Sequence, residues 1–391
     1  MKLNVMGFGQ CGGRVADEFA RMNSFARGTR HTELFPVVAA VNTDAADLSG
    51  LESIPRDAHR RILLGSGETG GHGVGKINQA GADIARENIE KIIEAVSREP
   101  RSGEADGFLF LAGAGGGTGS GCVPVVTKIF RERYPNKPVY DLIVLPFEHE
   151  ETTEEQTVFN TATCLKSCFT AANAVFLMDN QRYANRDRAM LASIAQINHA
   201  IAAPFYDLLC AGEEKRPKHI GAKTLDAGDI IQTLNGWTVI GYGKAKAGGS
   251  GIGWRQKADF DATSTHLLRS IGAVDEAMSK LSASCNPADA ETALYLLCGP
   301  ARETNLDIIR DVGDYLRRKA PGATIRNGDY PIGGDALGVH VVLSGLSNVE
   351  KVRRYFSRSS ELISEFRKRQ EEAQRKAKSL DELGENLPTL L

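Results

Sequence analysis

Glycine occupies six of the nine positions over residues 113–121 of this 391-residue chain, in a pattern suited to holding phosphate groups. Glycine has no Cβ, so backbone N–H groups can approach a ligand closely, and Thr118 and Ser120 add hydroxyl donors. The apolar run 108–112 predicts a buried strand before the loop, and 123–130 predicts a helix after it, whose N-terminus favours negative charge. We therefore interpret the loop as a phosphate cradle. The alternative, a flexible linker, is rarely placed between a buried strand and a helix.

A second glycine pattern, Gly7, Gly9 and Gly12, follows a strand predicted over 2–6 and precedes a helix predicted from about Val15. Alone, this G-x-G-x-x-G spacing is typical of a dinucleotide-binding fold. Such a fold also needs an acidic residue about 20 positions further on, and Asp44 lies well beyond that spacing. A NAD-dependent Rossmann oxidoreductase remains a remote alternative, because it leaves residues 113–121 unexplained.

Two acids and two amides complete the set of candidate functional side chains. Asp226 and Asp229 are three positions apart and would share one face if a helix begins there. By themselves they are also typical of a helix N-cap followed by a first-turn acid. Asn180 follows a strand predicted over 174–178, and Asn198 lies on a long predicted helix.

Strands alternate with helices in the first half of the chain, which predicts a doubly wound parallel sheet with ligands at the carboxyl ends of its strands. Further strands of this half are predicted at 37–41, 61–64 and 141–147. The apolar spacing over 187–210 predicts a helix. Strands at 238–243, 293–298 and 339–343, with helices near 263–283 and 304–319, predict a second, smaller α/β domain.

These patterns divide the chain into four segments. We expect a nucleotide-binding domain over 1–183, a central helix over 184–212, a second α/β domain with an acidic loop near 224–230 over 213–346, and a C-terminal helix with a charged tail over 347–391. The turn 244–253 is expected to be an exposed loop. The last helix, about 348–378, is expected to pack its apolar side up to Phe366 and to extend into solvent beyond it.

Composition narrows the class of protein. With 47 basic and 49 acidic residues, no global field attracts nucleic acid or a membrane surface. No apolar run is long enough to span a bilayer, and the chain begins with a strand instead of a signal peptide. None of the seven cysteines forms a CxxC pair, so we expect free thiols, a cytoplasmic location and no metal site made of protein ligands.

The loop 113–121 resembles the glycine-rich signature loop of the tubulin/FtsZ superfamily, and Gln10-Cys11-Gly12 resembles that family's first phosphate loop. The segment Val41-Asn42-Thr43-Asp44 is similar to a second loop of the family. Within the superfamily, residues 47–55 and 71–75 look most like CetZ, an archaeal group associated with cell shape.

The resemblance implies a fold and a site. The fold is a doubly wound parallel-sheet GTPase domain joined by a long central helix to a smaller α/β domain. Asn180 and Asn198 would recognise guanine, Glu150 would contact ribose, and Asp226 and Asp229 would be catalytic in the neighbouring subunit's active site. Phe159 or Tyr183 could stack on the base. The expected nucleotide-binding residues are Gln10, Cys11, Gly12, Gly13, Arg14, Asn42, Gly71, Gly115, Gly116, Gly117, Thr118, Gly119, Glu150, Asn180 and Asn198.

The sequence departs from the FtsZ pattern in three places. Thr224 stands where an Asn is expected before the first catalytic Asp, and Glu151 and Glu154 replace a Gly and an Arg. Residues 381–391 do not match the C-terminal peptide by which many FtsZ proteins reach membrane adaptors, so the adaptors remain unidentified. The last departure favours CetZ over FtsZ.

The implied function is a cytoskeletal GTPase that binds GTP or GDP with Mg²⁺, assembles with itself head to tail, and hydrolyses GTP at the subunit interface. An FtsZ-type division protein and a nucleotide-dependent scaffold without useful turnover remain alternatives. The resemblance predicts no nucleic-acid partner and allows lateral sheets of filaments.

Overall fold

The computed structural model describes residues 1–184, 190–216, 219–245, 260–301, 304, 306–333 and 336–365. Its described strands form one ten-stranded sheet in the order β3-β2-β1-β4-β5-β6-β7-β10-β8-β9. The bounds are β1 (Leu3–Phe8), β2 (Val38–Asn42), β3 (Arg61–Leu63), β4 (Gly107–Gly113), β5 (Val139–Leu145), β6 (Ala174–Asp179), β7 (Gly236–Ala245), β8 (Thr292–Gly299), β9 (Thr324–Pro331) and β10 (Leu337–Ser344).

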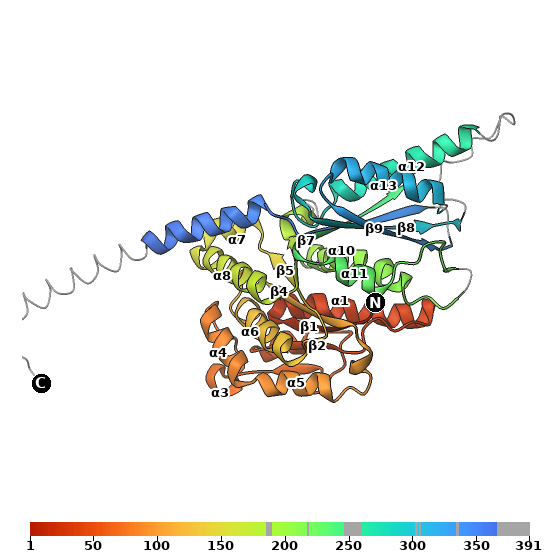
Figure 1. Ribbon diagram of the computed structural model, residues 1–391. Helices are drawn as coiled ribbons and strands as arrows, with labels where there is room; N and C mark the ends of the chain where they lie inside the picture. Colours follow the sequence, from red (N-terminus) through yellow and green to blue (C-terminus); the bar gives the residue numbers. More distant parts are fainter. Residues whose placement is uncertain are drawn as a thin grey trace, which may run out of the picture.

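Helices cover both faces of this sheet (Figure 1). The longer ones are α1 (Gly9–Arg30), α4 (Asn78–Glu87), α5 (Ile89–Ser97), α6 (Thr118–Arg133), α8 (Glu155–Ala171), α10 (Met190–Ala211), α12 (Phe260–Ser279) and α13 (Leu306–Lys319). The short ones are α2 (Ala45–Ser49), α3 (Ser66–Thr69), α7 (Glu148–Thr153), α9 (Asn180–Tyr183), α11 (Ala227–Thr233) and the 3₁₀ turns Ser102–Glu104 and Pro287–Asp289.

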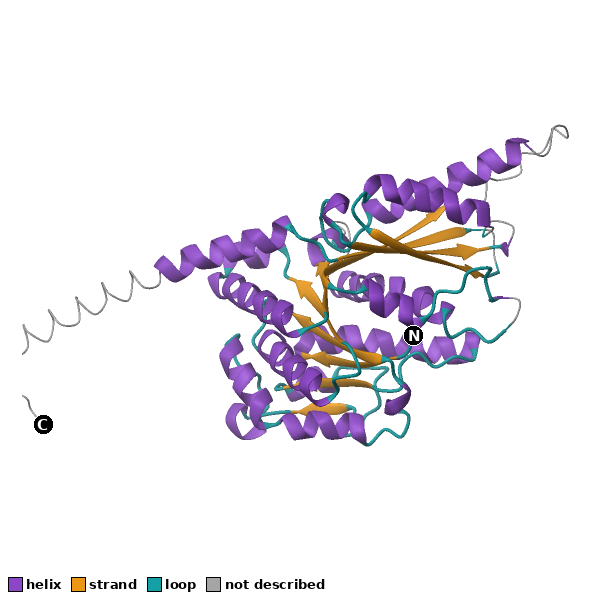
Figure 2. Cartoon of the chain, in the orientation of Figure 1, coloured by secondary structure: helices purple, strands orange, loops and turns teal. Residues whose placement is uncertain are grey.

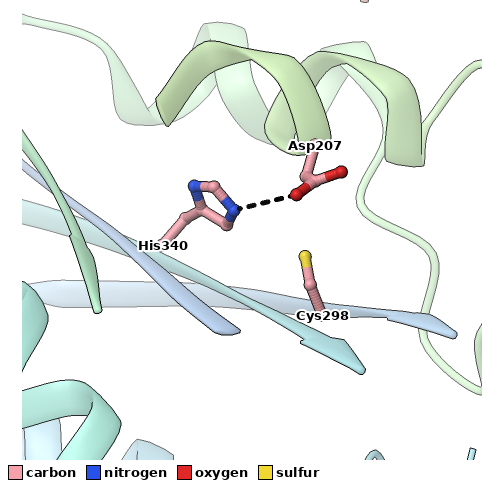
Figure 3. Close-up of side chains that lie close together, drawn as sticks. All are labelled: Asp207, Cys298 and His340. Carbon is pink, nitrogen blue, oxygen red and sulfur yellow. Dashed lines mark ion pairs between the residues drawn. The ribbon is translucent and has the colours of Figure 1, made fainter. Parts of the chain in front are cut away.

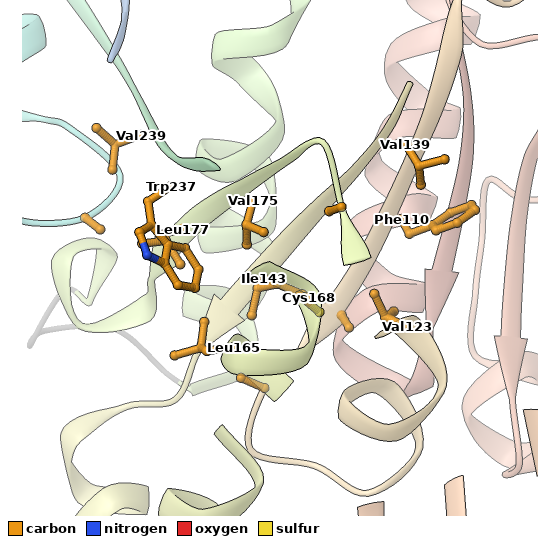
Figure 4. Close-up of a cluster of buried hydrophobic side chains, with 14 of the residues drawn as sticks. Phe110, Val123, Val139, Ile143, Leu165, Cys168, Val175, Leu177, Trp237 and Val239 are labelled. Atoms are coloured by element: carbon orange, nitrogen blue, oxygen red, sulfur yellow. The ribbon is translucent and has the colours of Figure 1, made fainter. Parts of the chain in front are cut away.

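The alternation of buried residues along each strand divides the core into two layers. On β1, Met6 and Phe8 pack into the layer under α4, α5, α6 and α8. Leu3 and Val5 pack on the opposite side, under α1 and α10. Figure 4 shows the first layer continuing across the strands from Phe110 to Val239. The predicted doubly wound architecture is therefore confirmed.

The strands of the second half continue the sheet of the first half, and the expected domain bounds stay a prediction. β7 pairs in parallel with β6 and in antiparallel with β10, so the parallel and antiparallel parts share one hydrogen-bonded row. Figure 2 shows this row running through the whole molecule, with α10 beside it. The two halves consequently share a core.

Sequence patterns missed one strand and misplaced two helix starts. β9 pairs in parallel with β8 at the edge of the sheet, although its residues include Asn327-Gly328-Asp329, which is typical of a turn. Helix α1 begins at Gly9, several residues before Val15, and α6 begins at Thr118. The residues expected in the first phosphate loop therefore lie within α1, whereas Gly115, Gly116 and Gly117 form the turn before α6.

The C-terminal helix, described over residues 350–365, is attached to the first half by a buried polar cluster. The Lys351 ammonium lies 2.6 Å from an Asp179 carboxylate oxygen and 3.3 Å from one of Glu151, and each of these side chains is about 10% exposed. The Tyr355 hydroxyl also donates to Glu151. Thus Glu151, which departs from the FtsZ pattern, anchors this helix.

Several expectations lie outside the described residues. They are most of the predicted loop 244–253, Phe366, the helix extension to 378 and the tail 379–391. Among the residues described, no helix has the length and apolar character needed to cross a membrane.

Candidate nucleotide-binding site

Two long helices start side by side with uncapped N-termini. α1 follows β1 and α6 follows β4, and these two strands are neighbours in the sheet. Phe8 precedes α1 and Gly117 precedes α6. At neither position does a side chain accept a hydrogen bond from the N–H groups of the first helical turn. Because the first N–H groups of a helix lack internal partners, both N-termini can bind an anion.

Close backbone contact between the two helix starts requires glycine. Gly9 has φ +69°, and a Cβ there would lie 2.9 Å from the Gly119 nitrogen. A Cβ on Gly119 would lie 2.7 Å from the Phe8 carbonyl oxygen. Any larger residue would force the two starts apart and divide the anion site.

The turn from β4 to α6 is held by Asn160 of α8. The Asn160 Nδ2 group donates to the carbonyl oxygens of Gly115 at 3.2 Å, Gly116 at 3.1 Å and Lys76 at 2.8 Å. Gly116 itself faces open space, because a Cβ built there meets no atom within 4 Å. The loop is therefore fixed from behind and open in front. Sequence reasoning missed Asn160, which lies inside a helix with no local motif.

Loops after β2 and β3 close one side of the cradle. The Gln10 amide donates to Asp47 Oδ1 at 2.7 Å, and the Asn42 amide donates to Asp47 Oδ2 at 3.0 Å. The side-chain Oδ1 of Asn42 accepts from the Thr43 N–H at 2.8 Å. The Asn42 side chain therefore stabilises its own loop. The hydroxyl groups of Thr43 and Thr118 form a hydrogen bond of 2.7 Å, which connects this loop to α6.

The third loop carries Gly71, which has φ +79° and accepts a hydrogen bond from the Ala45 N–H through its carbonyl oxygen at 3.0 Å. This loop continues to Val74, which packs against the glycine turn so closely that a Cβ on Gly117 would lie 2.6 Å from it. Gly71 therefore belongs to the same cluster of loops as residues 113–117.

Cys11 and Glu150 lie close enough to interact. Burial and, to a smaller extent, the negative charge of Glu150 raise the pKa of the Cys11 thiol to about 12, with Arg14 acting in the opposite direction. Cys11 lies against Gly113, where an added Cβ would be 2.9 Å from its own. Glu150 Oε2 accepts from the Phe147 N–H at 2.8 Å, which places its carboxylate at the start of α7.

The two asparagines expected to recognise the base have free side chains. Asn180 is the first residue of α9, directly after β6, and Asn198 lies on α10. Both are half-buried, and within the described chain neither side-chain amide forms a hydrogen bond. β6 is three strands from β1, about 14 Å along the carboxyl edge of the sheet.

The two aromatic candidates for stacking lie in different places. Phe159 lines an outer groove between α4, α6 and α8, together with Lys128 and Arg131. The same groove includes Ser120 and Gly121 of α6, and the stacking expectation for Phe159 stays a prediction. Tyr183 ends α9, close in sequence to Asn180.

Asp226 and Asp229 lie at the other end of the molecule. Gly236, just after α11, pairs with Ala174 at the amino end of β6, whereas Asn180 follows its carboxyl end. The length of β6 alone separates these ends by about 17 Å. Ile230 of α11 also lines a cavity with Met1, at the amino end of β1. The two acids cannot reach the phosphate cradle of their own chain.

The acidic helix start is braced by the strand that sequence analysis missed. Asp226 Oδ1 accepts from the Asp229 N–H at 2.9 Å, so Asp226 is indeed an N-cap. Asp229 pairs with Arg326 of β9 at 3.8 Å. Asp329 of the same strand accepts the Ala222 and Lys223 N–H groups at 3.0 and 2.6 Å, which fixes the preceding loop.

Comparison with known proteins places this geometry in a family. The GTPase domain of the tubulin/FtsZ family matches residues 2–186, and the C-terminal domain of tubulin-like CetZ matches residues 187–361. Tubulin-like protein CetZ1 of Haloferax volcanii is 32% identical over 367 residues, which cover 90% of each chain. Tubulin-like protein CetZ of Thermococcus kodakarensis is 26% identical over 384 residues, which cover 97% of this chain and 91% of the relative.

Solved structures agree with these matches. The GDP-bound monomer of Haloferax volcanii CetZ1 is similar with a TM-score of 0.79 and 29% identity, covering 93% of this chain and 100% of that structure. The GTPγS-bound protofilament of CetZ2 from the same organism has a TM-score of 0.79 and 28% identity, covering 94% of this chain and 100% of that structure.

Proposed function

Since this chain belongs to the CetZ group of the tubulin/FtsZ family of GTPases, we propose that it assembles head to tail and hydrolyses GTP between successive subunits. The opposite placement of the phosphate cradle and of Asp226 and Asp229 carries this proposal. Each chain holds half of a hydrolytic site at each end, so a translated copy supplies the missing half. Such a head-to-tail contact does not close on itself and generates a filament. The protofilament of the relative CetZ2 supports this assembly.

In the nucleotide half, backbone N–H groups at the start of α1, in the turn before α6 and at the start of α6 would hold the phosphates. The proposed contacts are Gln10, Cys11, Gly12, Gly13 and Arg14 on one side and Gly115, Gly116, Gly117, Thr118 and Gly119 on the other. Asn42 and Gly71 would act by positioning the neighbouring loops, since Asn42 is engaged with Asp47.

The base and the ribose would lie toward β6. The free amides of Asn180 and Asn198 each offer a donor and an acceptor, which can distinguish guanine from adenine because a wrong base leaves a buried polar group unpaired. Glu150 would approach the ribose, although one of its oxygens already accepts from the Phe147 N–H.

A magnesium ion fits this site, because Mg²⁺ is typically held by phosphate oxygens, waters and one or two carboxylates. Asp47 is an acidic side chain that Gln10 ties to the first loop, and we propose it as the supporting carboxylate. When bound, Mg²⁺ neutralises charge on the β- and γ-phosphate oxygens.

The incoming subunit would supply Asp226 and Asp229 to the γ-phosphate. A carboxylate in hydrogen-bond reach of water can orient it and accept its proton during attack on phosphorus. The hydrogen bond to the Asp229 N–H fixes the Asp226 carboxylate, and Arg326 restrains Asp229. Their position was predicted, whereas their bracing by β9 was not.

The decisive experiment measures phosphate release per subunit as protein concentration rises, with electron microscopy of the same samples. We expect the rate per subunit to rise together with filament mass, because each new contact completes one site. A rate that is independent of concentration contradicts the shared site. Filaments without phosphate release would instead favour the non-hydrolysing scaffold, the alternative that the Thr224 departure leaves open.

We further propose a role in cell-shape control instead of division, supported by the match to CetZ over both halves of the chain. A deletion strain should change shape and continue to divide at the normal rate. Division arrest would favour the FtsZ-type alternative.

A further inference from the structure

A buried group of potential metal ligands lies between α10 and the strands of the second half, far from the nucleotide loops. It consists of Asp207 from α10, Cys298 from β8 and His340 from β10, and one ligand atom from each lies within 4.8 Å of the others (Figure 3). Cys298 and His340 are each about 1% exposed. The GTPase mechanism uses none of these side chains.

Secondary structure brings the three together. Cys298 pairs with Gly338 across the β8–β10 ladder, so His340, two residues further along, projects from the same face of the sheet. Gly338 leaves this position without a side chain, and Asp207 approaches from the helix above. Figure 3 shows all three side chains pointing toward one another.

The histidine ring has no hydrogen bond in its buried position. Within the described chain, neither Nδ1 nor Nε2 of His340 has a hydrogen-bond partner. Nε2 lies 3.6 Å from Asp207 Oδ2, which is too long for a hydrogen bond. Two ligands of one tetrahedral zinc ion, with bonds of about 2.0–2.3 Å, lie about 3.3–3.8 Å apart. The observed separation therefore suits a shared ion better than a direct contact.

We propose that Asp207 Oδ2, Cys298 Sγ and His340 Nε2 bind one Zn²⁺ ion, with water in the fourth position. A set of one sulfur, one nitrogen and one oxygen ligand suits zinc better than magnesium or calcium, which select oxygen. The Asp207 side chain is 19% exposed, which gives ions and water a path to the site.

A cation at this site would balance the Asp207 carboxylate and the thiolate that Cys298 supplies as a ligand. Formation of the zinc–sulfur bond replaces the S–H bond, and the proton passes to solvent.

The ion would join α10 to the hydrogen-bonded strands β8 and β10, against which α10 otherwise packs apolar side chains. α10 carries Asn198 nine residues before Asp207, about 13 Å along the helix. Zinc would thus fix the central helix to β8 and β10, which belong to the half of the chain that carries the acidic loop. Sequence spacing did not reveal this site, because its ligands come from three separate segments.

Cobalt(II) provides the test, because its complexes with thiolate absorb in the near ultraviolet. The full-length protein is stripped with a chelator, freed of nucleotide and titrated with Co²⁺, and then Zn²⁺ is added in competition. We expect one equivalent to bind, with a thiolate-to-cobalt band that zinc abolishes. Cys298→Ser should remove the band, and Asp207→Asn should weaken binding on the order of 100-fold.

Cys285→Ser is the matched control, because Cys285 is a half-buried cysteine of the same half outside the cluster, and it should behave as wild type. Binding of less than one equivalent to the wild type overturns the proposal, as does a thiolate band that persists in Cys298→Ser. If Cys298→Ser does not fold, the test rests on Asp207→Asn, which replaces a partly exposed side chain. An unchanged affinity of this variant for Co²⁺ overturns the proposal.

Discussion

At the scale of single residues, Asp226 has two roles that can be separated by substitution. Its carboxylate caps α11 through the Asp229 N–H, and the proposed mechanism also uses its charge on the neighbouring subunit. The sequence pattern allowed both interpretations, and the structure establishes the cap. Because asparagine caps a helix as well as aspartate does, the charge can be removed while the cap is kept.

We expect Asp226→Asn to retain wild-type stability and GTP binding but to lose at least about 100-fold in phosphate release, as removal of a general base typically does. Asp226→Ala should lose the same activity and, in addition, about 1 kcal/mol of unfolding free energy, because the cap is lost. The measurements are phosphate release and chemical denaturation. Asp314→Asn, at an exposed ion pair on α13, is the control. Full activity in Asp226→Asn contradicts the catalytic role and leaves only the cap.

Asp141 in β5 gives the protein a pH dependence that no motif predicts. Its side chain is fully buried, accepts from the Thr127 hydroxyl at 2.6 Å, and burial raises its pKa to about 7. The folded state therefore keeps a proton that the unfolded chain loses near pH 4. This contribution to stability is complete below pH 4, falls as the pH rises toward 7, and is then constant.

Asp141→Asn should flatten this part of the profile, because an amide does not ionise. The difference in unfolding free energy between variant and wild type should change by up to about 4 kcal/mol in favour of the variant between pH 4 and 8. Denaturant titrations across that pH range measure this difference. Asp83→Asn, which changes an exposed side chain of α4, is the control. Parallel profiles for the two proteins are incompatible with a neutral Asp141.

At the scale of elements, tertiary contacts explain what the sequence could not predict. The glycine loops were located correctly because glycine is needed wherever two backbones approach, as at Gly9 and Gly119. The start of α1 was wrong, since the same glycines that open a loop can also begin a helix. β9 was missed because its Asn-Gly-Asp segment is extended only through pairing with β8. Asn160 lies in no recognisable pattern and Asp329 in one typical of a turn, yet each braces one half of the proposed active site.

The C-terminal helix is linked to the proposed base site through a single carboxylate, that of Asp179. Asp179 accepts both the Lys351 ammonium and the Gln181 N–H, so the same carboxylate attaches the helix and caps α9, where Asn180 lies. Removal of the Lys351 charge leaves Glu151 and Asp179 buried without their shared cation.

We expect Lys351→Met to lower the unfolding free energy by about 3–5 kcal/mol, the usual cost of breaking a buried ion pair on one side. It should also weaken GDP binding, because α9 loses its fixed position. Denaturation and titration with a fluorescent nucleotide measure the two effects. Arg358→Met, at an exposed position of the same helix, should change neither. Reduced stability with unchanged nucleotide affinity would show that α9 keeps its position without this contact.

At the scale of the whole molecule, the proposed division of the active site predicts complementation between two defective chains. Gly116→Asp should fold, because a side chain there meets no neighbouring atom, but its carboxylate should repel phosphate from the cradle. Asp226→Asn should bind nucleotide and lack the acid. In a mixed filament, the nucleotide of the second variant meets the intact acids of the first.

Mixing these two variants should therefore release phosphate well above the sum of the separate rates. A mixture of Asp226→Asn with Asp229→Asn, two acid-deficient chains, should stay close to that sum. Gly322→Asp, at another open glycine, should bind nucleotide normally. Failure of the first mixture to exceed the second, in filaments seen by microscopy, contradicts the shared site.

The separation of cradle and acids by the length of the sheet also sets an order of events in time. In the proposed filament, the outermost subunit at one end carries a nucleotide that no acid yet faces. That nucleotide stays intact until the next subunit arrives, so hydrolysis follows growth by one subunit. A fast-growing end therefore carries several uncleaved GTP molecules, whereas at a stalled end hydrolysis reaches every nucleotide except the outermost one.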